Sequence, residues 1–343
     1  MIYPFFRPLL FTLDPETAHD LTFASLDLAV RCGIAPKLAP RVLPSPVTAM
    51  GLGFPNRIGL AAGLDKNAAH IDGLATLGFG FIECGTVTPR PQPGNPKPRV
   101  FRLAGSEAMI NRLGFNNEGV SRFLANAEKA SWRGILGLNI GKNFDTPNAR
   151  AADDYLACLR AVYARASYVT VNVSSPNTRG LRDLQSEEAL ANLVAALKTE
   201  QKALSDKHGK YTPIAVKIAP DLAMDTVDGI ARILVRHHVD GVVATNTTIA
   251  RDGVKGHAYA DEPGGLSGRP LRVQATAVVA RLAKALDGAL PIIGVGGILT
   301  GADAKEKIDA GATLVQIYTG LIYRGPDLVA ECARAVATFA AKQ

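Results

Sequence analysis

Two hydrophobic patterns alternate along most of this chain. Short apolar runs rich in β-branched residues end in Gly, Asn, Ser or Thr, and longer segments with helical spacing follow, such as residues 187–204 and 226–237. The strand-like runs are residues 57–64, 80–87, 135–141, 168–174, 214–219, 241–247, 292–296 and 314–320. Eight buried-type strands alternating with helices predict an α/β protein whose parallel sheet closes as a (β/α)8 TIM barrel. A doubly wound open sheet is the alternative, and the even spacing favours closure.

The gap after the second strand is irregular. It begins TPRPQPGNPKPR, and this Pro- and Gly-rich stretch predicts a loop. Residues 100–103 and 108–110 could pair as a hairpin before a helix near 118–130. Because long insertions after barrel strands usually cover the active-site face, we expect this segment there.

The first 45 residues form a separate helical element, and the barrel is expected to span 46–343. Residues 4–11 predict a short apolar helix, and Asp14-Pro15-Glu16 predicts the start of a second helix that stops at Gly33. Apolar residues occupy more than one side of that second helix. Two interpretations are open: a helical cap on the barrel floor, or an element that rests on a membrane surface.

Composition narrows the choice of partners. The chain has 343 residues, 20% of them charged, and a formal net charge of +7. The basic residues are dispersed, which disfavours a nucleic-acid groove. None of the four cysteines lies in a CxxC pair, so we expect no metal site and a reducing compartment. The start carries no signal-peptide pattern, and no apolar run reaches the ~20 residues of a membrane span.

At the predicted strand ends, amides and hydroxyls greatly outnumber carboxylates. Asn139, Asn172 and Asn246 are examples. An amide offers a donor and an acceptor in one plane, so several of them suit a planar ligand with alternating N–H and C=O edges, such as a pyrimidine or an isoalloxazine. The alternative is that these residues merely cap helices. Glycines at 296–297 and 320 stand where barrels commonly bind phosphate.

Two lysines are candidate charged groups. Lys217 lies inside the apolar run AVKIAP and should be buried, and a buried lysine must be paired or functional. It could form a Schiff base, as in a barrel aldolase, or place a fixed positive charge beside a cofactor. Lys66 follows the first strand, where it could bind a carboxylate or simply lie in solvent.

Taken together, these strand ends resemble the dihydroorotate dehydrogenases of the second, quinone-reducing class. The matching stretches are AAGLDKNA (61–68), GTVTPRPQPGNPKPR (85–99), INRLGFNN (110–117), NIGKN (139–143), VNVSSPNTRGLRDLQ (171–185), AVKIAPDL (215–222), ATNTT (244–248), GGLSGRPL (264–271), IIGVGGI (292–298) and LVQIYTGLIYRGP (314–326). They span the whole predicted barrel. The start YPFFRPLLFTLDPETAH also resembles the helical extension of this class.

The resemblance implies one bound FMN and a dihydroorotate/orotate site. The residues that match FMN contacts are Ala62, Gly63, Leu64, Asp65, Lys66, Thr86, Asn139, Asn172, Lys217, Thr245, Gly268, Gly297, Tyr318 and Thr319. Those that match substrate contacts are Lys66, Asn111, Arg112, Leu113, Gly114, Phe115, Asn172, Asn177, Asn246 and Thr247. Ser175 matches the catalytic base, where the first class has cysteine. On its own, Ser175 would read as a turn hydroxyl before Pro176.

The implied reaction belongs to de novo pyrimidine (UMP) synthesis. Ser175 removes the C5 proton of dihydroorotate while FMN accepts hydride from C6. The loop 174–180 could close over the site, with Thr178 relaying the proton. A membrane quinone would reoxidise the flavin by a path near His19, Arg102 and Tyr318, through residues 1–45. The resemblance therefore also implies a peripheral protein on the cytoplasmic face of the cell membrane, with no obligate protein subunit.

Three rival functions remain for this sequence. A Schiff-base lyase using Lys217 would be colourless and could be trapped with borohydride. A tRNA-reducing flavoprotein would suit the basic charge, although no clustered basic patch is visible. A non-catalytic barrel is disfavoured by the many polar strand ends, because such groups reduce stability unless they are used.

Overall fold

The eight predicted strands form one closed parallel barrel. The computed structural model describes residues 3–35 and 40–340. The barrel strands are β3 (Ile58–Leu60), β4 (Phe81–Val87), β7 (Ile135–Ile140), β8 (Tyr168–Asn172), β9 (Ile214–Ile218), β10 (Gly241–Ala244), β12 (Ile292–Val295) and β13 (Leu314–Ile317). They pair in this order, and β13 pairs with β3, so the sheet has no free edge. This confirms the TIM barrel and excludes the open sheet.

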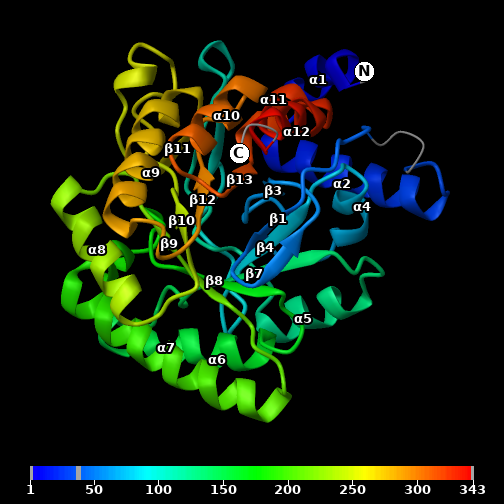
Figure 1. Cartoon of the computed structure of the whole chain (residues 1–343). Coiled ribbons are helices and arrows are strands. Elements are labelled where there is room, and N and C mark those ends of the chain that lie inside the picture. Colours follow the sequence, from blue (N-terminus) through cyan, green and yellow to red (C-terminus); the bar gives the residue numbers. More distant parts are fainter. Residues whose placement is uncertain (1–2, 36–39, 341–343) are drawn as a thin grey trace.

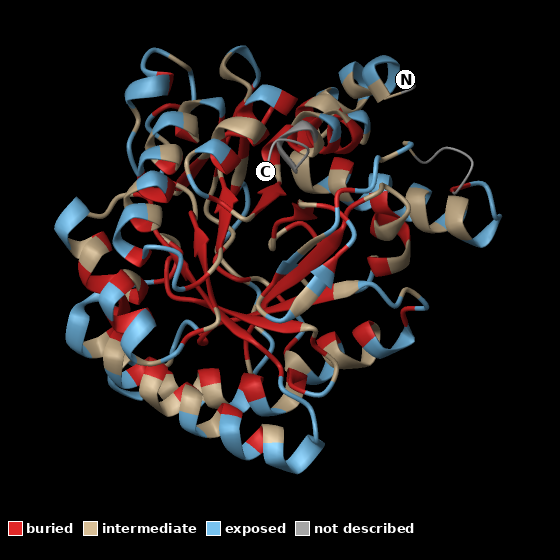
Figure 2. Ribbon diagram, in the orientation of Figure 1, coloured by how far each residue is buried: buried red, intermediate tan, exposed pale blue. Residues whose placement is uncertain are grey.

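Helices surround the barrel in sequence order, and the strands they cover are buried except for the partly buried Ile135 at the start of β7 (Figures 1 and 2). They are α4 (Ile71–Ala75), α5 (Val120–Lys129), α6 (Ala151–Val162), α7 (Glu187–His208), α8 (Met224–Arg236), α9 (Arg272–Leu286), α10 (Gly301–Asp309), α11 (Thr319–Arg324) and α12 (Asp327–Ala340). The predicted helices over 118–130, 187–204 and 226–237 correspond to α5, α7 and α8. Element boundaries differ by a few residues, as helix ends usually do.

The amino-terminal end of the barrel is closed by a two-stranded hairpin, β1 (Val47–Ala49) and β2 (Leu52–Phe54). The Phe54 ring packs edge-on against the ring of Phe81, the first residue of β4, with centroids 5.1 Å apart. Both rings belong to an apolar cluster inside the barrel. The floor is therefore covered by residues that follow the N-terminal helices, and the interpretation of those helices as a floor cap is wrong.

The N-terminal helices are α1 (Tyr3–Thr12) and α2 (Pro15–Arg31). The Asp14 carboxylate accepts from the backbone N–H groups of Glu16 and Thr17, both at 3.0 Å, which confirms the predicted N-cap. The α2 helix packs on α4 and β5, and the α1 helix packs on α11. These contacts place the helices beside the carboxyl ends of the barrel strands (Figure 1).

The irregular insertion contains the predicted hairpin, β5 (Val100–Leu103) and β6 (Ala108–Asn111). A third strand, β11 (Gly265–Gly268), joins β6 in antiparallel register and was not predicted. Its sequence GLSG has the composition of a loop, and its partner lies about 150 residues earlier in the chain, so no local pattern marks it. The resulting small sheet brings Asn111 and Ser267 to the barrel mouth.

Candidate active site

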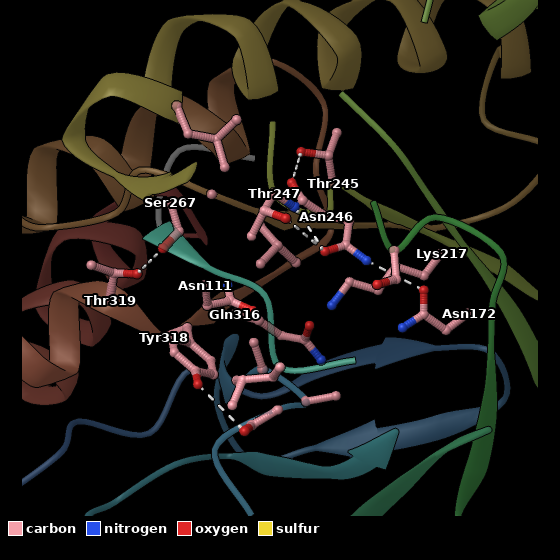
Figure 3. A pocket seen from close by; sticks show the side chains of 18 of the residues that line it. Asn111, Asn172, Lys217, Thr245, Asn246, Thr247, Ser267, Gln316, Tyr318 and Thr319 are labelled. Carbon is pink, nitrogen blue, oxygen red and sulfur yellow. Dashed lines mark hydrogen bonds between the residues drawn. The ribbon is translucent and has the colours of Figure 1, made fainter. Parts of the chain in front are cut away.

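A cavity opens at the carboxyl ends of the barrel strands. Its empty volume is about 970 Å³, including its open mouth. The predicted site residues that line it are Ala62, Gly63, Lys66, Thr86, Asn111, Leu113, Gly114, Phe115, Asn172, Ser175, Asn177, Lys217, Thr245, Asn246, Thr247, Gly268, Gly297, Tyr318 and Thr319. Residues far apart in the sequence therefore meet around one space, and Figure 3 shows several of their side chains facing it.

Amide and hydroxyl groups form a connected set on one wall. The Asn246 side-chain N–H donates to Asn172 Oδ1 at 3.3 Å (Figure 3). It also donates to Ser174 Oγ at 3.0 Å. Asn177 donates to Asn111 Oδ1 at 3.3 Å. These contacts join the loops after β8 and β10 to the hairpin of the insertion. The wall presents fixed hydrogen-bonding groups to a planar ligand, as predicted from the strand ends.

Ser175 lies on this wall at the start of the loop after β8. Its side chain is 5% exposed, and its Oγ accepts from the backbone N–H of Asn177 at 3.2 Å. Arg182 holds the loop against its neighbour by donating to the carbonyls of Ser174 and Thr247. The nearby Thr178 hydroxyl is buried without a hydrogen-bond partner in the described part of the chain. Ser175 is therefore held by its own loop and largely shielded from water.

The two candidate lysines both line the cavity. Lys217 is 5% exposed, and burial lowers its pKa while the negative charge of Glu83 partly opposes this. Burial also lowers the pKa of Lys66, to about 8, against the opposing effect of the Glu16 carboxylate. No carboxylate of the described residues forms an ion pair with either ammonium, so both remain able to bind an anionic ligand.

Three polar residues in or next to the site were not predicted as site residues from the sequence. Glu83 and Gln316 lie within the strands rather than at their ends, and Gln316 Nε2 donates to Glu83 Oε2 at 2.8 Å. Ser267 comes from the unpredicted strand β11 and accepts from Thr319 Oγ1 at 2.8 Å (Figure 3). A polar residue inside an otherwise apolar barrel strand was the available signal for Glu83 and Gln316.

Four of the predicted contacts do not line this cavity. Asp65 instead accepts from the backbone N–H groups of Ala69 and His70 and so shapes the loop after β3. The Arg112 guanidinium pairs with Glu262 at 2.5 Å. The two others, Leu64 and Asn139, are buried, and the Asn139 side chain lies behind the cavity wall rather than in it.

A second cavity, with about 1250 Å³ of empty volume, lies between α2 and the barrel mouth. It shares Lys66, Asn111, Leu113, Ser267 and Tyr318 with the first cavity. His19 lines it and contacts the Leu64 carbonyl at 2.7 Å. Arg102 lines neither cavity: its guanidinium donates to the Leu13 carbonyl at 2.8 Å. The shared residues connect the candidate active site to the N-terminal helices.

Within residues 3–35 and 40–340, no group of three or more His, Cys, Asp or Glu side chains is arranged to hold a metal ion. Within the same ranges, no helix combines the length and apolar character that a membrane crossing requires.

Comparison with known proteins identifies the family. The model of the family described as dihydroorotate dehydrogenase matches residues 45–339. The chain is 61% identical over 339 residues to a protein of Chromobacterium violaceum named dihydroorotate dehydrogenase (quinone), covering 99% of this chain and 98% of that protein. A protein of the same name from Aromatoleum aromaticum is 62% identical over 340 residues, which are 99% of this chain and 96% of that protein.

Solved structures agree with this relationship. The structure of an enzyme titled DHODH from Eimeria tenella, in complex with ferulenol, superimposes with a TM-score of 0.86 at 38% identity. The match covers 96% of this chain and 92% of the other. A ligand-free structure from the same organism gives a TM-score of 0.85 at 39% identity, with 96% of each chain covered. The chain therefore belongs to the dihydroorotate dehydrogenase family.

Proposed function

We propose that this protein oxidises dihydroorotate to orotate with bound FMN and passes the electrons to a membrane quinone, as a step of de novo pyrimidine synthesis. The observation that carries the proposal is one cavity that gathers two ammonium groups without ion-pair partners among the described residues, a set of amides and the shielded Ser175 hydroxyl. The relatives that bear the name dihydroorotate dehydrogenase (quinone) support the choice of substrate and acceptor.

The cavity suits a flavin phosphate. Gln316 Oε1 is buried at its lining without a partner among the described residues, so an acceptor is available for a ligand N–H group. The backbone at Gly268, Gly296 and Gly297 has φ of 93°, 112° and 76°, a conformation that glycine adopts without strain and that allows close approach of a phosphate. The residues that would hold FMN are Ala62, Gly63, Thr86, Asn172, Lys217, Thr245, Gly268, Gly297, Tyr318 and Thr319.

In this proposal FMN, when bound, supplies the hydride acceptor. Lys66 binds the substrate carboxylate, and Asn111, Asn177 and Asn246 orient the pyrimidine ring through its amide edges. Ser175 takes the proton from C5, and its shielding from water favours that transfer over exchange with solvent. As Ser175 takes this proton it must release its own, and the Thr178 hydroxyl, buried without a partner among the described residues, is the candidate to receive it.

The test is spectroscopic. The purified protein should be yellow, and dihydroorotate added without oxygen should bleach the flavin band. A quinone should restore the colour, whereas NAD and fumarate should not. A colourless protein, or covalent trapping of Lys217 by borohydride in the presence of a carbonyl substrate, would favour the Schiff-base lyase instead.

Orotate binding should weaken as pH rises through the pKa of Lys66. That pKa is about 8, so the ammonium is mostly protonated at neutral pH and mostly neutral one unit above the pKa. Between about pH 7 and about pH 9 the protonated fraction, and with it the orotate affinity, should fall about tenfold. Titration of orotate into the flavoprotein at each pH measures this, with Lys66→Met as control. A dependence that persists in Lys66→Met would assign the titration to another group.

We also propose that residues 1–45 form a membrane-surface element through which the quinone reaches the second cavity, near His19, Tyr318 and Arg102. The exposed apolar side chains on α1 and α2 support this: Phe5 is 82% exposed, Phe6 56% and Leu9 66%, with Leu21 and Leu28 also exposed. Solvated side chains of this size are unfavourable in water. The element would hold the protein on the cytoplasmic face of the cell membrane as a peripheral protein.

Vesicle flotation tests the membrane proposal. The double variant Phe5→Ser/Leu9→Ser should bind liposomes at least about tenfold more weakly, because each buried apolar side chain contributes roughly 1.5–3 kcal/mol. Ile249→Ser removes an exposed apolar side chain that is not on α1 or α2 and should leave binding unchanged. Equal flotation of the double variant and the wild-type protein would contradict the proposal.

A further inference from the structure

A line of hydrogen bonds runs from the cavity wall into the centre of the barrel, and every donor in it points the same way. Asn172 Nδ2 donates to Thr86 Oγ1 at 2.9 Å. Thr86 Oγ1 donates to Asn139 Oδ1 at 2.6 Å, and Asn139 Nδ2 donates to Glu83 Oε1 at 2.8 Å. The line therefore begins at an amide that faces the cavity and ends at a carboxylate that does not.

Among the four residues of this line, only Glu83 can fix the direction in which the hydrogen bonds run from donor to acceptor. A carboxylate accepts hydrogen bonds and donates none, whereas an amide or a hydroxyl can do both. The second oxygen, Oε2, also receives only donors: the Tyr168 hydroxyl at 2.9 Å and Gln316 Nε2 at 2.8 Å. Glu83 is completely buried, so water cannot take the place of any of these partners. Reversal of the line would leave a buried group unpaired.

We propose, on the basis of the function proposed above, that Glu83 is a positioning residue that fixes the donor and acceptor orientation of the cavity amides. With its Nδ2 directed to Thr86, Asn172 must turn its Oδ1 toward Asn246 Nδ2 and Ser174 Oγ, as found at 3.3 and 3.0 Å. Glu83 thereby determines which edge the Asn172 and Asn246 amides present to FMN and orotate.

The surroundings of Glu83 explain how a buried carboxylate is tolerated there. Lys217 enters the barrel interior from β9, and the charge of Glu83 opposes the effect of burial on its pKa. Burying a charge is unfavourable unless it is hydrogen-bonded and balanced by another charge. Three donors and one nearby ammonium meet this requirement. Because burying the Glu83 carboxylate is unfavourable in free energy, a functional role explains its presence in the barrel better than packing does.

The test begins with Glu83→Gln, which keeps the shape but places an NH2 group among three donors. The apoprotein is titrated with FMN and the flavoprotein with orotate, both without turnover. Orotate affinity should fall by at least about tenfold, because a buried donor loses its acceptor or the Asn172 amide turns over. Gln201→Leu is the matched control. It removes a buried side chain that donates to the Thr212 carbonyl away from the site, so it should lower the melting temperature without changing either affinity.

A double variant tests the donor-to-acceptor direction of the hydrogen-bond line. It moves the carboxylate from residue 83 to residue 139, the neighbouring member of the line. In Glu83→Gln/Asn139→Asp, the new aspartate can accept from both Thr86 and the new glutamine, which restores the original direction. Asn139→Asp alone places two carboxylates in contact and should weaken binding. The double variant should therefore bind orotate within about threefold of the wild type, and better than either single variant.

The outcomes separate this inference from the proposed function. If the wild-type protein binds neither FMN nor orotate, the proposed function fails. If it binds both and Glu83→Gln binds equally well, or if the double variant is no better than the single ones, the positioning role fails. Should Glu83→Gln not fold, Thr86→Val and Thr86→Ser test the next link: the valine variant should lose orotate affinity and the serine variant should keep it. Equal affinities for these two would overturn the inference.

Discussion

Replacing Ser175 with alanine is expected to slow the reduction of bound flavin by dihydroorotate by about 10²–10⁴-fold, the usual contribution of a positioned general base. FMN and orotate should bind as in the wild type, because Ser175 is only 5% exposed and, among the described residues, its hydroxyl accepts only from the backbone N–H of Asn177. Anaerobic stopped-flow measurement of flavin bleaching provides the rate, and equilibrium titration provides the affinities.

A second variant distinguishes chemistry from packing at this position. Ser175→Cys retains a group that can take a proton. It should reduce flavin faster than Ser175→Ala. The assignment of Ser175 as base would be contradicted if the alanine variant bleached within about threefold of the wild-type rate, well below the effect expected of a general base.

Replacing Lys217 with methionine is expected to have the next largest effect. Its ammonium is buried at the cavity floor and forms no ion pair among the described residues, so its charge acts directly on what the cavity holds. Loss of a preorganised charge from such a site typically costs about 10²–10³-fold in rate. The midpoint potential of the bound flavin should also fall, because less positive charge remains to stabilise the added electrons. Spectroelectrochemical titration measures this potential.

Lys307 provides a matched control for Lys217. It is also fully buried, and its ammonium donates to the Arg272 carbonyl at 3.0 Å and to Thr276 Oγ1. It does not line the candidate active site. Lys307→Met should therefore lower the melting temperature without shifting the flavin potential. If both lysine variants shifted the potential equally, the effect of Lys217 would be general destabilisation rather than a charge effect at the site.

The arrangement of Glu83 and Lys217 bears on how the site combines binding with reactivity. The same carboxylate that ends the hydrogen-bond line also faces the lysine across the barrel interior. On the proposal above, one buried carboxylate that does not line the cavity would orient the amides and also act on the charge of Lys217. Orotate affinity reports on the orientation of the amides, and flavin potential reports on the charge of Lys217. The Glu83 and Lys217 variants can therefore be told apart by these two measurements.

The barrel could be predicted from local sequence patterns. Each strand is a short apolar run buried on both faces, and each is followed by a segment of helical period, so local patterns were sufficient to count and order them. The helix start at Asp14 was equally local, because an N-cap depends only on the next three residues. The motifs at the strand ends were enough to indicate the family, and nineteen of the predicted site residues line one cavity because parallel strands all end on the same side.

Features that depend on contacts between distant segments could not be predicted from local patterns. Strand β11 forms because β6 offers it an edge, and its own residues do not favour a strand. Asn139 and Thr86 both follow strand patterns, yet only Thr86 reaches the cavity, because Asn139 is turned toward Glu83. The N-terminal helices lie at the barrel mouth rather than the floor because the hairpin β1–β2 already fills the floor. The hydrophobic period predicts which residues are buried. It does not predict which buried polar groups form hydrogen bonds with one another, because the geometry of the closed sheet determines these partners.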